Sequence, residues 1–328
     1  MTGGRILFLH ANDAPFVRAD RQILSEAYDI EEIDCSRGAS IPQILRALRG
    51  VVMSYSWFAL GYAARAVLGG KLLGRPSVVV AGGWDVASMP EISYGATRGR
   101  RGLVRARFIL RRADTLLTFS ESSRRMMQTM SGRDPIVVHL GVDIDRFTPR
   151  EPKEGLVVTV GNVTRENLGR KGLETFVRSA AFLPDVPFVL AGAHVDDGVE
   201  RLRSIATPNV ALPGRLSDED LQNLLGRAKV YVQVSYTEGF GLAVAEAMSC
   251  GCVPVVTSEG SLPEIVGESG LYAPYGDASA TADVIRQALT SDRGPAARER
   301  VRDRFSLDRR RDRVLQIVEG VLEGRNAS

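Results

Sequence analysis

The sequence predicts an α/β protein made of two doubly wound, Rossmann-like domains that face a cleft. Three observations predict this class. The chain has 328 residues, a length that fits two domains better than one. Short apolar runs alternate with amphipathic stretches, as in parallel sheets covered by helices. The alternation pauses once near residue 150 and then restarts. Hydrophobic residues make up 44% and charged residues 25% of the chain, which is typical of a globular protein.

The apolar runs are rich in Val, Ile and Leu and mostly do not alternate, which indicates strands buried on both faces. In the first half the expected strands are Arg5–His10, Asp29–Asp34, Val51–Ser54, Ser77–Ala81, Thr115–Phe119 and Ile136–Leu140. In the second half they are Leu156–Gly161, Pro187–Ala191, Val210–Leu212, Val230–Val234 and Val253–Thr257. Amphipathic stretches between them predict helices, among them Arg18–Ala27, Gly172–Phe182, Asp218–Ala228 and Gly241–Cys250.

The segment Phe147–Gly155 holds two prolines and four charges without periodicity, so we expect it to link the domains. The first domain is then residues 1–150 and the second 151–305. A C-terminal helix at about 306–328 is expected to pack back on the first. Because ligands of such sheets bind beyond the carboxyl ends of the strands, the cleft between the domains is the expected site.

The composition indicates where in the cell the protein is expected to act and what kind of partner it is expected to bind. No run of 18 apolar residues is present, so no membrane span is expected, and Ile6–Leu9 is too short for a signal-peptide core. The three cysteines form no disulfide or metal framework, which favours a reducing, cytoplasmic location. Residues 1–150 carry 21 Lys and Arg against 14 Asp and Glu, a net charge of +7, whereas the rest carries −4. We expect the basic half to meet something anionic.

The strongest chemical signal is the strand, loop and helix within 230–251. The helix is opened by Gly239, Phe240, Gly241 and Leu242. Backbone N–H groups at such a helix start suit a diphosphate, and the glycines allow its close approach. Glu246 could accept two hydrogen bonds from a ribose diol, and Glu238 could bind sugar hydroxyls. The alternative is an ordinary amphipathic helix with Glu246 in solvent, but apolar neighbours favour a buried carboxylate that needs partners.

Two further segments carry weaker signals. The loop after the expected strand Leu156–Gly161 contains Arg165, Arg170 and Lys171, followed by Gly172. These cations could neutralise a diphosphate through charge-assisted hydrogen bonds, although a solvated basic loop is the alternative. Farther along, Ser217 and Asp220 have the spacing of a capping box and predict a helix start.

These motifs resemble those of retaining GT-B glycosyltransferases of the family called GT4, or glycosyl transferases group 1. Glu238 and Glu246 fit the Glu-x7-Glu pattern of that family, and the resemblance covers residues 136–275. The matching stretches are Ser235…Glu238-Gly-Phe-Gly-Leu…Glu246-Ala-Met…Gly251…Pro254-Val-Val, Gly260-Ser-Leu-Pro-Glu264-Ile-Val and Leu140-Gly-Val-Asp143…Phe147-Thr-Pro149.

The resemblance implies an enzyme that moves a sugar from a UDP-, GDP- or ADP-sugar to the hydroxyl of a glycan or lipid-linked acceptor, with retention of anomeric configuration. The donor is expected on the second domain and the acceptor on the first. Glu246 is then expected to bind the ribose and Glu238 the donor sugar. Arg215 and Leu216 are expected beside the nucleobase, although a capped surface helix explains Arg215 almost as well.

The resemblance also implies that Lys171 and one arginine stabilise the departing diphosphate. The family places this arginine directly after the strand's glycine, where this chain has Asn162. We expect Arg165 to take its place, with Arg170 as the rival.

In the first domain, the candidates on the acceptor side are His10, Asp13 and Asp85, which follow expected strands. Relatives often carry a His near Asp85, where this chain has Trp84 and Asp85. Structural roles are the alternatives, since a polar residue at a strand end often satisfies the backbone.

The segment Arg98–Arg112 holds seven arginines and no acidic residue, interspersed with Leu, Val, Phe and Ile. It could be a basic amphipathic helix that lies on an anionic membrane surface. The favoured interpretation is peripheral contact with the inner face of the membrane, because relatives of this family often act on lipid-linked acceptors there. A solvated basic face is the alternative. Because no nucleic-acid motif accompanies the arginines, no nucleic acid is expected as a partner.

Neither a metal nor a cofactor is expected, because no Asp-x-Asp pair lies at a strand end and fixed cations could stabilise the leaving diphosphate instead. A Rossmann oxidoreductase is disfavoured, since Gly239 and Gly241 are followed by Val244 where the motif needs a third glycine. The open alternatives are a nucleotide-sugar epimerase, a glycan phosphorylase on the same fold, or a non-catalytic sugar-binding homologue.

Overall fold

The computed structural model describes residues 4–326, which divide into two compact units. The first unit contains residues 4–140 and 308–326, and the second contains residues 141–307. The division falls at Leu140, upstream of the segment predicted as the linker. That segment packs within the second unit, since Phe147 is buried and Lys153 Nζ donates to the carbonyls of Gly226 (2.6 Å) and Cys250 (2.5 Å). The C-terminal helix belongs to the first unit.

The first unit is a parallel six-stranded sheet with helices on both faces, in the strand order β2-β1-β3-β4-β5-β6. Its strands are β1 (Arg5–His10), β2 (Asp29–Asp34), β3 (Met53–Trp57), β4 (Ser77–Val80), β5 (Thr115–Thr118) and β6 (Ile136–Val137). Its helices are α1 (Pro15–Ser25), α2 (Ile41–Arg49), α3 (Gly61–Leu73), the short η1 (Pro90–Ile92), α4 (Arg100–Arg112), α5 (Glu121–Ser131) and α14 (Leu307–Asn326).

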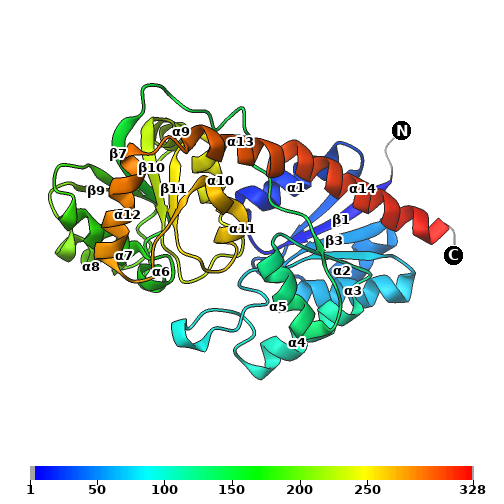
Figure 1. Cartoon of the computed structure of the whole chain (residues 1–328). Coiled ribbons are helices and arrows are strands. Elements are labelled where there is room, and N and C mark those ends of the chain that lie inside the picture. Colours follow the sequence, from blue (N-terminus) through cyan, green and yellow to red (C-terminus); the bar gives the residue numbers. More distant parts are fainter. Residues whose placement is uncertain (1–3, 327–328) are drawn as a thin grey trace. The chain divides into compact units, whose positions relative to one another are not determined.

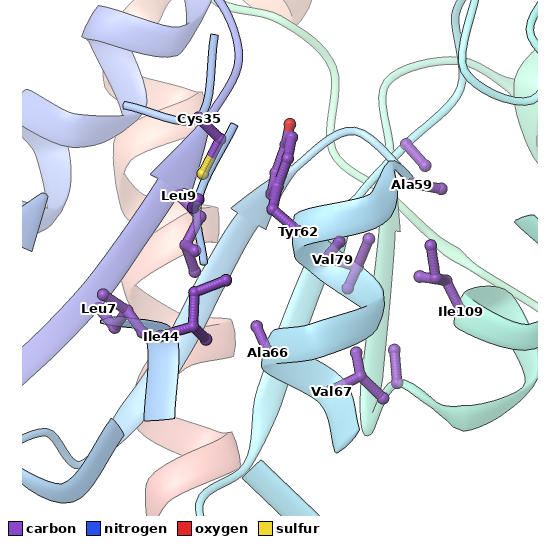
Figure 2. Packing of buried hydrophobic residues seen from close by; sticks show 14 of the residues in the cluster. Leu7, Leu9, Cys35, Ile44, Ala59, Tyr62, Ala66, Val67, Val79 and Ile109 are labelled. Carbon is purple, nitrogen blue, oxygen red and sulfur yellow. The ribbon is translucent and has the colours of Figure 1, made fainter. Parts of the chain in front are cut away.

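The core of the first unit forms where α3 covers the sheet. Figure 2 shows Tyr62, Ala66 and Val67 of α3 packed among the buried side chains of Leu9 on β1 and Val79 on β4. These strand residues are apolar and fully buried, as expected for strands covered on both faces.

A buried ion pair attaches α14 to the rest of the first unit. Arg310 donates to both carboxylate oxygens of Asp20 on α1, at 2.6 and 2.7 Å, and both side chains are at most 2% exposed. Tyr55 on β3 donates to the same carboxylate at 2.7 Å. Arg310 also donates to the carbonyls of Val138 and His139. The pair joins residues 290 positions apart in the sequence, and α14 lies along α1 in Figure 1.

The second unit is also a parallel six-stranded sheet, in the order β12-β11-β10-β7-β8-β9. Its strands are β7 (Glu154–Val160), β8 (Phe188–Ala191), β9 (Val210–Gly214), β10 (Ala228–Gln233), β11 (Val253–Val256) and β12 (Leu271–Tyr272). Its helices are α6 (Arg165–Arg170), α7 (Leu173–Ser179), η2 (Ala180–Phe182), α8 (Gly198–Ile205), α9 (Asp218–Arg227), α10 (Leu242–Ser249), α11 (Leu262–Val266), η3 (Gly267–Ser269), α12 (Ala278–Thr290) and α13 (Gly294–Arg304).

The core of the second unit lies between its sheet and the covering helices. It includes Val157 of β7, Phe176 of α7, Val232 of β10 and Ile285 of α12. The two sheets confirm the prediction of two doubly wound, Rossmann-like α/β domains. In the part of the chain that the structure describes, no helix is both long and apolar enough to cross a membrane.

Candidate functional site

The order of strands in the second unit places a switch point between β7 and β10. From β7 the chain proceeds outward through β8 and β9, whereas β10, β11 and β12 continue on the other side. Crevices at the carboxyl ends of strands where this reversal occurs are the usual ligand sites of open α/β sheets. The two signals singled out from the sequence follow these two strands, since β7 leads to Lys171 and β10 leads to Glu238.

Lys171 and Glu238 form an ion pair at this edge of the sheet. Lys171 Nζ lies 3.1 Å from Glu238 Oε1, and the two side chains are 21% and 12% exposed. The same carboxylate oxygen accepts hydrogen bonds from Gln233 Nε2 (2.9 Å) and Ser235 Oγ (3.2 Å). Burial alone would raise the pKa of Glu238, but the positive charges of Lys171 and Arg170 and the hydrogen bonds from Lys171 and Ser235 lower it below its usual value. Glu238 is therefore ionised at neutral pH.

The position of Lys171 depends on the glycine that follows it. Thr164 caps the short helix α6, and its side chain accepts the backbone N–H of Asn167 at 3.0 Å. Gly172 then has a φ of +67° and begins α7. A Cβ atom at Gly172 would lie 2.1 Å from the carbonyl oxygen of Val234, so the approach of this turn to the end of β10 requires glycine.

The two candidate arginines lie in different environments. Arg165 bonds Asp197 through its guanidinium and is 75% exposed. Arg170 is only 11% exposed and donates to Asn167 Oδ1 at 2.6 Å. Its charge lowers the pKa of Glu238, which places it near that carboxylate. Arg170 also pairs with Glu166 at 3.2 Å. Of the two arginines, it is Arg170, the rival, whose charge acts on Glu238.

Glu246 lies on the second turn of α10 and is partly buried. No residue among 4–326 donates a hydrogen bond to its carboxylate. Burial raises its pKa to about 7, with the charge of Asp218 adding to the shift and that of Arg146 opposing it. The buried Tyr231 on β10 also has a raised pKa, caused first by burial and then by the nearby charges of Glu238 and Glu246. The charges of both carboxylates therefore act on the same buried tyrosine.

The loop between β10 and α10 is fixed by contacts with Ser261 and Phe305. It contains Gly239, Phe240, Gly241 and Leu242. Ser261 Oγ contacts the carbonyl oxygens of Glu238 (3.0 Å) and Phe240 (2.7 Å). The ring of Phe240 is buried and packs edge-on against Phe305 at 5.8 Å, so this side chain belongs to the core. Gly241 has a φ of +98° and begins α10, and no side chain caps that helix start. The opening turn of α10 is therefore an uncapped helix N-terminus beside two carboxylates and two cations.

The predicted nucleobase residues lie at the next helix start. Ser217 caps α9, and its side chain accepts the N–H of Asp220 at 3.1 Å. Arg215 is exposed and Leu216 is partly exposed, just before that cap. Arg146 pairs with Asp218 on the first turn of α9 at 2.7 Å, and these are the two charged groups that act on Glu246. The start of α9 therefore lies on the Glu246 side of the site.

The candidates of the first unit have structural partners. His10 is buried and hydrogen-bonds the carbonyl of Asn12 and Glu32 Oε1, each at 2.8 Å. Asp13 is exposed and binds Arg18. Asp85 is 1% exposed and accepts the backbone N–H groups of Ala59 (2.8 Å), Gly83 (2.9 Å) and Gly82 (3.3 Å). Burial raises the pKa of Asp85, and these amides oppose that shift. The geometry around His10 and Asp85 favours the structural alternatives.

Gln233 and Tyr231 were not singled out as site residues from the sequence. Gln233 bridges Tyr231, Ser235 and Glu238, with the Tyr231 hydroxyl at 3.0 Å from Gln233 Oε1 and the Gln233 amide at 2.8 Å from Ser235 Oγ. A glutamine within the apolar run Val230–Val234 is the signal that could have identified it. In the described part of the chain, no group of three or more His, Cys, Asp or Glu side chains is arranged to hold a metal ion.

Comparison with solved structures shows the fold. A TM-score of 0.79 relates 97% of this chain to all of a HepE structure from Anabaena described as a complex with UDP and glucose, at 16% identity. The same TM-score relates 98% of the chain to all of a sucrose-phosphate synthase from Thermosynechococcus elongatus, at 19% identity. The fold is therefore that of the two-domain GT-B glycosyltransferases.

Comparison of sequences matches part of the chain. D-inositol 3-phosphate glycosyltransferases from Mycobacterium sp. (strain KMS) and Mycobacterium tuberculosis (strain F11) are 31% and 32% identical over 212 and 207 residues. These alignments cover 57% of this chain and 47% or 43% of the relatives, so the chain spans about half the length of the curated relatives that it matches. Residues 154–291 match the family described as glycosyl transferases group 1.

Proposed function

We propose that this protein transfers a sugar from a nucleotide-diphosphate sugar to an acceptor hydroxyl. The observation that carries the proposal is the grouping of Lys171, Arg170, Glu238 and Glu246 at the switch point of the second sheet, next to the uncapped start of α10. A nucleotide sugar offers a diol, a diphosphate and sugar hydroxyls, and the site contains groups for each of them.

Glu246 is assigned to the ribose. Its side chain is partly buried, receives no hydrogen bond from residues 4–326 and has a pKa raised to about 7. A buried polar group without a partner is costly, and perturbed carboxylates of this kind are typical of functional sites. Two hydroxyl donors from a ribose would satisfy it and would stabilise its ionised form.

Lys171 and Arg170 are assigned to the diphosphate, together with the N–H groups at the start of α10. As the bond between the anomeric carbon and the phosphate oxygen breaks, its electron pair moves to that oxygen. Cations and helix N–H groups already fixed in place stabilise this charge as it develops, which is usually the largest catalytic contribution. They can act in place of a divalent metal, so we propose a metal-independent reaction.

Glu238 is assigned to the donor sugar. It is ionised and oriented by Lys171, Gln233 and Ser235, which use mainly one of its oxygens. The other oxygen, Oε2, can accept a hydrogen bond from a sugar hydroxyl. The acceptor oxygen forms the new bond to the anomeric carbon, and its proton passes to the departing diphosphate oxygen, which has taken the electron pair of the broken bond. Retention of configuration is part of the proposal and is supported by the resemblance of Glu238 and Glu246 to the pattern of retaining enzymes.

The nucleotide is proposed to be uridine, guanosine or adenosine diphosphate. The Anabaena HepE structure, which has the same fold, was solved with UDP and glucose, which favours UDP-sugars for the first trial. The acceptor is proposed to be a glycan or a lipid-linked hydroxyl compound bound by the first unit, with the protein at the cytoplasmic face of a membrane in the second case.

The direct test measures thermal stabilisation by UDP-, GDP- and ADP-sugars and then follows the fate of the donor. A ligand at 100 times its Kd stabilises the folded protein by about 2.7 kcal/mol. One of the three donors is expected to raise Tm in the wild type, and Glu246→Gln is expected to abolish that rise at the same concentration. Transfer releases the nucleoside diphosphate. Isomerised donor would instead indicate an epimerase, and dependence on free phosphate a phosphorylase. Stabilisation by none of the three donors would refute the proposal.

A further inference from the structure

The first unit has a surface where apolar side chains point into solvent between arginines. Leu68 and Leu72 on α3 are 50% and 82% exposed, and Val104 on α4 is 65% exposed. Helices α3 and α4 contact each other and lie side by side in Figure 1. We call this surface, formed by Ala64, Leu68, Leu72 and residues 100–112, the α3–α4 patch.

The spacing of the apolar residues makes the patch continuous. Ala64, Leu68 and Leu72 recur every four residues and therefore share one face of α3. Val104 and Phe108 have the same spacing on α4. Between the two helices lies a groove of about 560 Å³, lined by Ala64, Leu68, Val104, Phe108 and the arginines 100, 101 and 105. The apolar floor of this groove is thus bordered by positive charge.

The arginines of α4 have no acidic partners among the described residues. Helix α4 carries six arginines and no acidic residue. None of the six forms an ion pair with any residue among 4–326, and Arg105 Nε is buried without a hydrogen-bond partner. Elsewhere in the same unit, Arg124 pairs with Asp134 and Arg21 with Glu32. Positive charge left without acidic partners within the chain is complementary to an anionic partner.

We propose that the α3–α4 patch docks on an anionic lipid bilayer. Leu68, Leu72 and Val104 enter the boundary between headgroups and acyl chains, and the arginines bind lipid phosphates above them. Arginine is suited to this role because its aliphatic stem packs on apolar surface while its guanidinium reaches the headgroups. The exposed apolar groove favours a bilayer over an acidic protein or a nucleic acid, since hydrocarbon is needed to cover it. This inference is independent of the proposed sugar transfer.

The test is co-sedimentation of the full chain with phosphatidylcholine vesicles that contain or lack phosphatidylglycerol. The wild type is expected to bind only the anionic vesicles and to dissociate as salt is added. The double variant Arg100→Gln and Arg101→Gln is expected to bind about thirtyfold more weakly. Leu68→Ser with Val104→Ser should weaken binding about tenfold or more at unchanged charge, because the apolar contribution is lost.

The matched control is Arg309→Gln with Arg313→Gln on α14. These two exposed arginines belong to the same unit, and their replacement changes the net charge by the same amount. The control should stay within about threefold of the wild type. Equal losses in the control and in the patch variants would overturn the proposal, as would no binding to anionic vesicles. Equal binding to neutral vesicles, or self-association through the patch in sedimentation velocity without lipid, would also overturn it. Donor binding, measured separately, is expected to be unchanged in all these variants.

Discussion

Replacing Glu246 by glutamine is expected to stabilise the protein while weakening its binding of the donor. In the folded chain the pKa of Glu246 is raised from 4.5 to about 7, first by burial. The folded state therefore favours the protonated carboxyl, and ionisation of this group as pH rises costs stability. One pKa unit corresponds to about 1.4 kcal/mol, so this cost reaches at most about 3 kcal/mol above pH 7. Glutamine has a similar shape and never ionises.

The difference in stability should depend on pH in a defined direction. Near pH 4.5 the wild type and Glu246→Gln should unfold with similar free energies, because the carboxyl is protonated in the folded protein. The variant should gain relative to the wild type as pH rises from about 5 to 7 and keep that advantage at pH 8. At about 2–4 °C per kcal/mol for a unit of this size, the Tm difference should approach about 6–12 °C.

The assay is thermal unfolding of both proteins between pH 4.5 and 8, without ligand and with the donor that stabilises the wild type. Without ligand, the variant should have the higher Tm at pH 8. With donor, the wild type should gain stability and the variant should not. A difference in Tm that does not change with pH would show that the carboxylate is not destabilised by burial. The reasoning would then be refuted, whatever the variant does to donor binding.

Three further predictions concern other charged groups. Lys171→Met should slow transfer by about 10²–10³-fold, because it removes a fixed charge at the leaving group, whereas Lys171→Arg should recover part of the rate in steady-state kinetics. Arg170→Gln should slow transfer by at least about tenfold. Arg165→Gln, at an exposed position, should change the rate by less than about threefold. The opposite ranking would show that Arg165, and not Arg170, stabilises the diphosphate. Arg310→Met leaves Asp20 charged and buried, and should lower the free energy of unfolding in urea by about 3–5 kcal/mol. Adding Asp20→Asn to the same chain should restore stability, because the buried charge is then removed.

The fold was largely predictable because both sheets are parallel and buried on both faces. Such strands appear in the sequence as apolar runs such as Val230–Val234, and the helices between them as amphipathic stretches. Their ends were harder to place. The expected strand Val51–Ser54 is instead Met53–Trp57, because pairing with β1 and β4 decides which residues form the ladder. The helix expected at Arg18–Ala27 begins at Pro15, which is well suited to the first turn.

The closeness of Lys171 and Glu238 was predictable from the sequence, whereas the environments of the two arginines were not. The segment with Arg165 and Arg170 was expected to be a loop, but it forms the helix α6 after the cap at Thr164. Residues five apart on a helix differ by about 140° around its axis, so the two arginines must point in different directions. Only the packing of α6 decides which of them acts on the pKa of Glu238. No local pattern in the sequence contains that information.

The segment Phe147–Gly155 shows how composition can mislead. Two prolines and four charges without periodicity are typical of a linker. Here the segment is held to the second unit by hydrogen bonds. The backbone N–H of Arg150 donates to the carbonyl of Gly226 at 2.9 Å, and Lys153 Nζ donates to the same carbonyl. These contacts join residues more than 70 positions apart in the sequence. A tertiary contact at that separation cannot be read from a local window.

The return of α14 to the first unit determines the order in which the protein can be completed during synthesis. Asp20 and Tyr55 are made early, but Arg310, which neutralises the buried carboxylate, is made 290 residues after Asp20. The whole second unit, residues 141–307, leaves the ribosome before that arginine does. Until Arg310 is made, Asp20 in the nascent first unit therefore has no arginine to pair with. The second unit by then has every residue it needs to fold. A gene fragment ending at Leu140 should for this reason yield an unstable product, and fusing residues 308–326 to it should rescue the product.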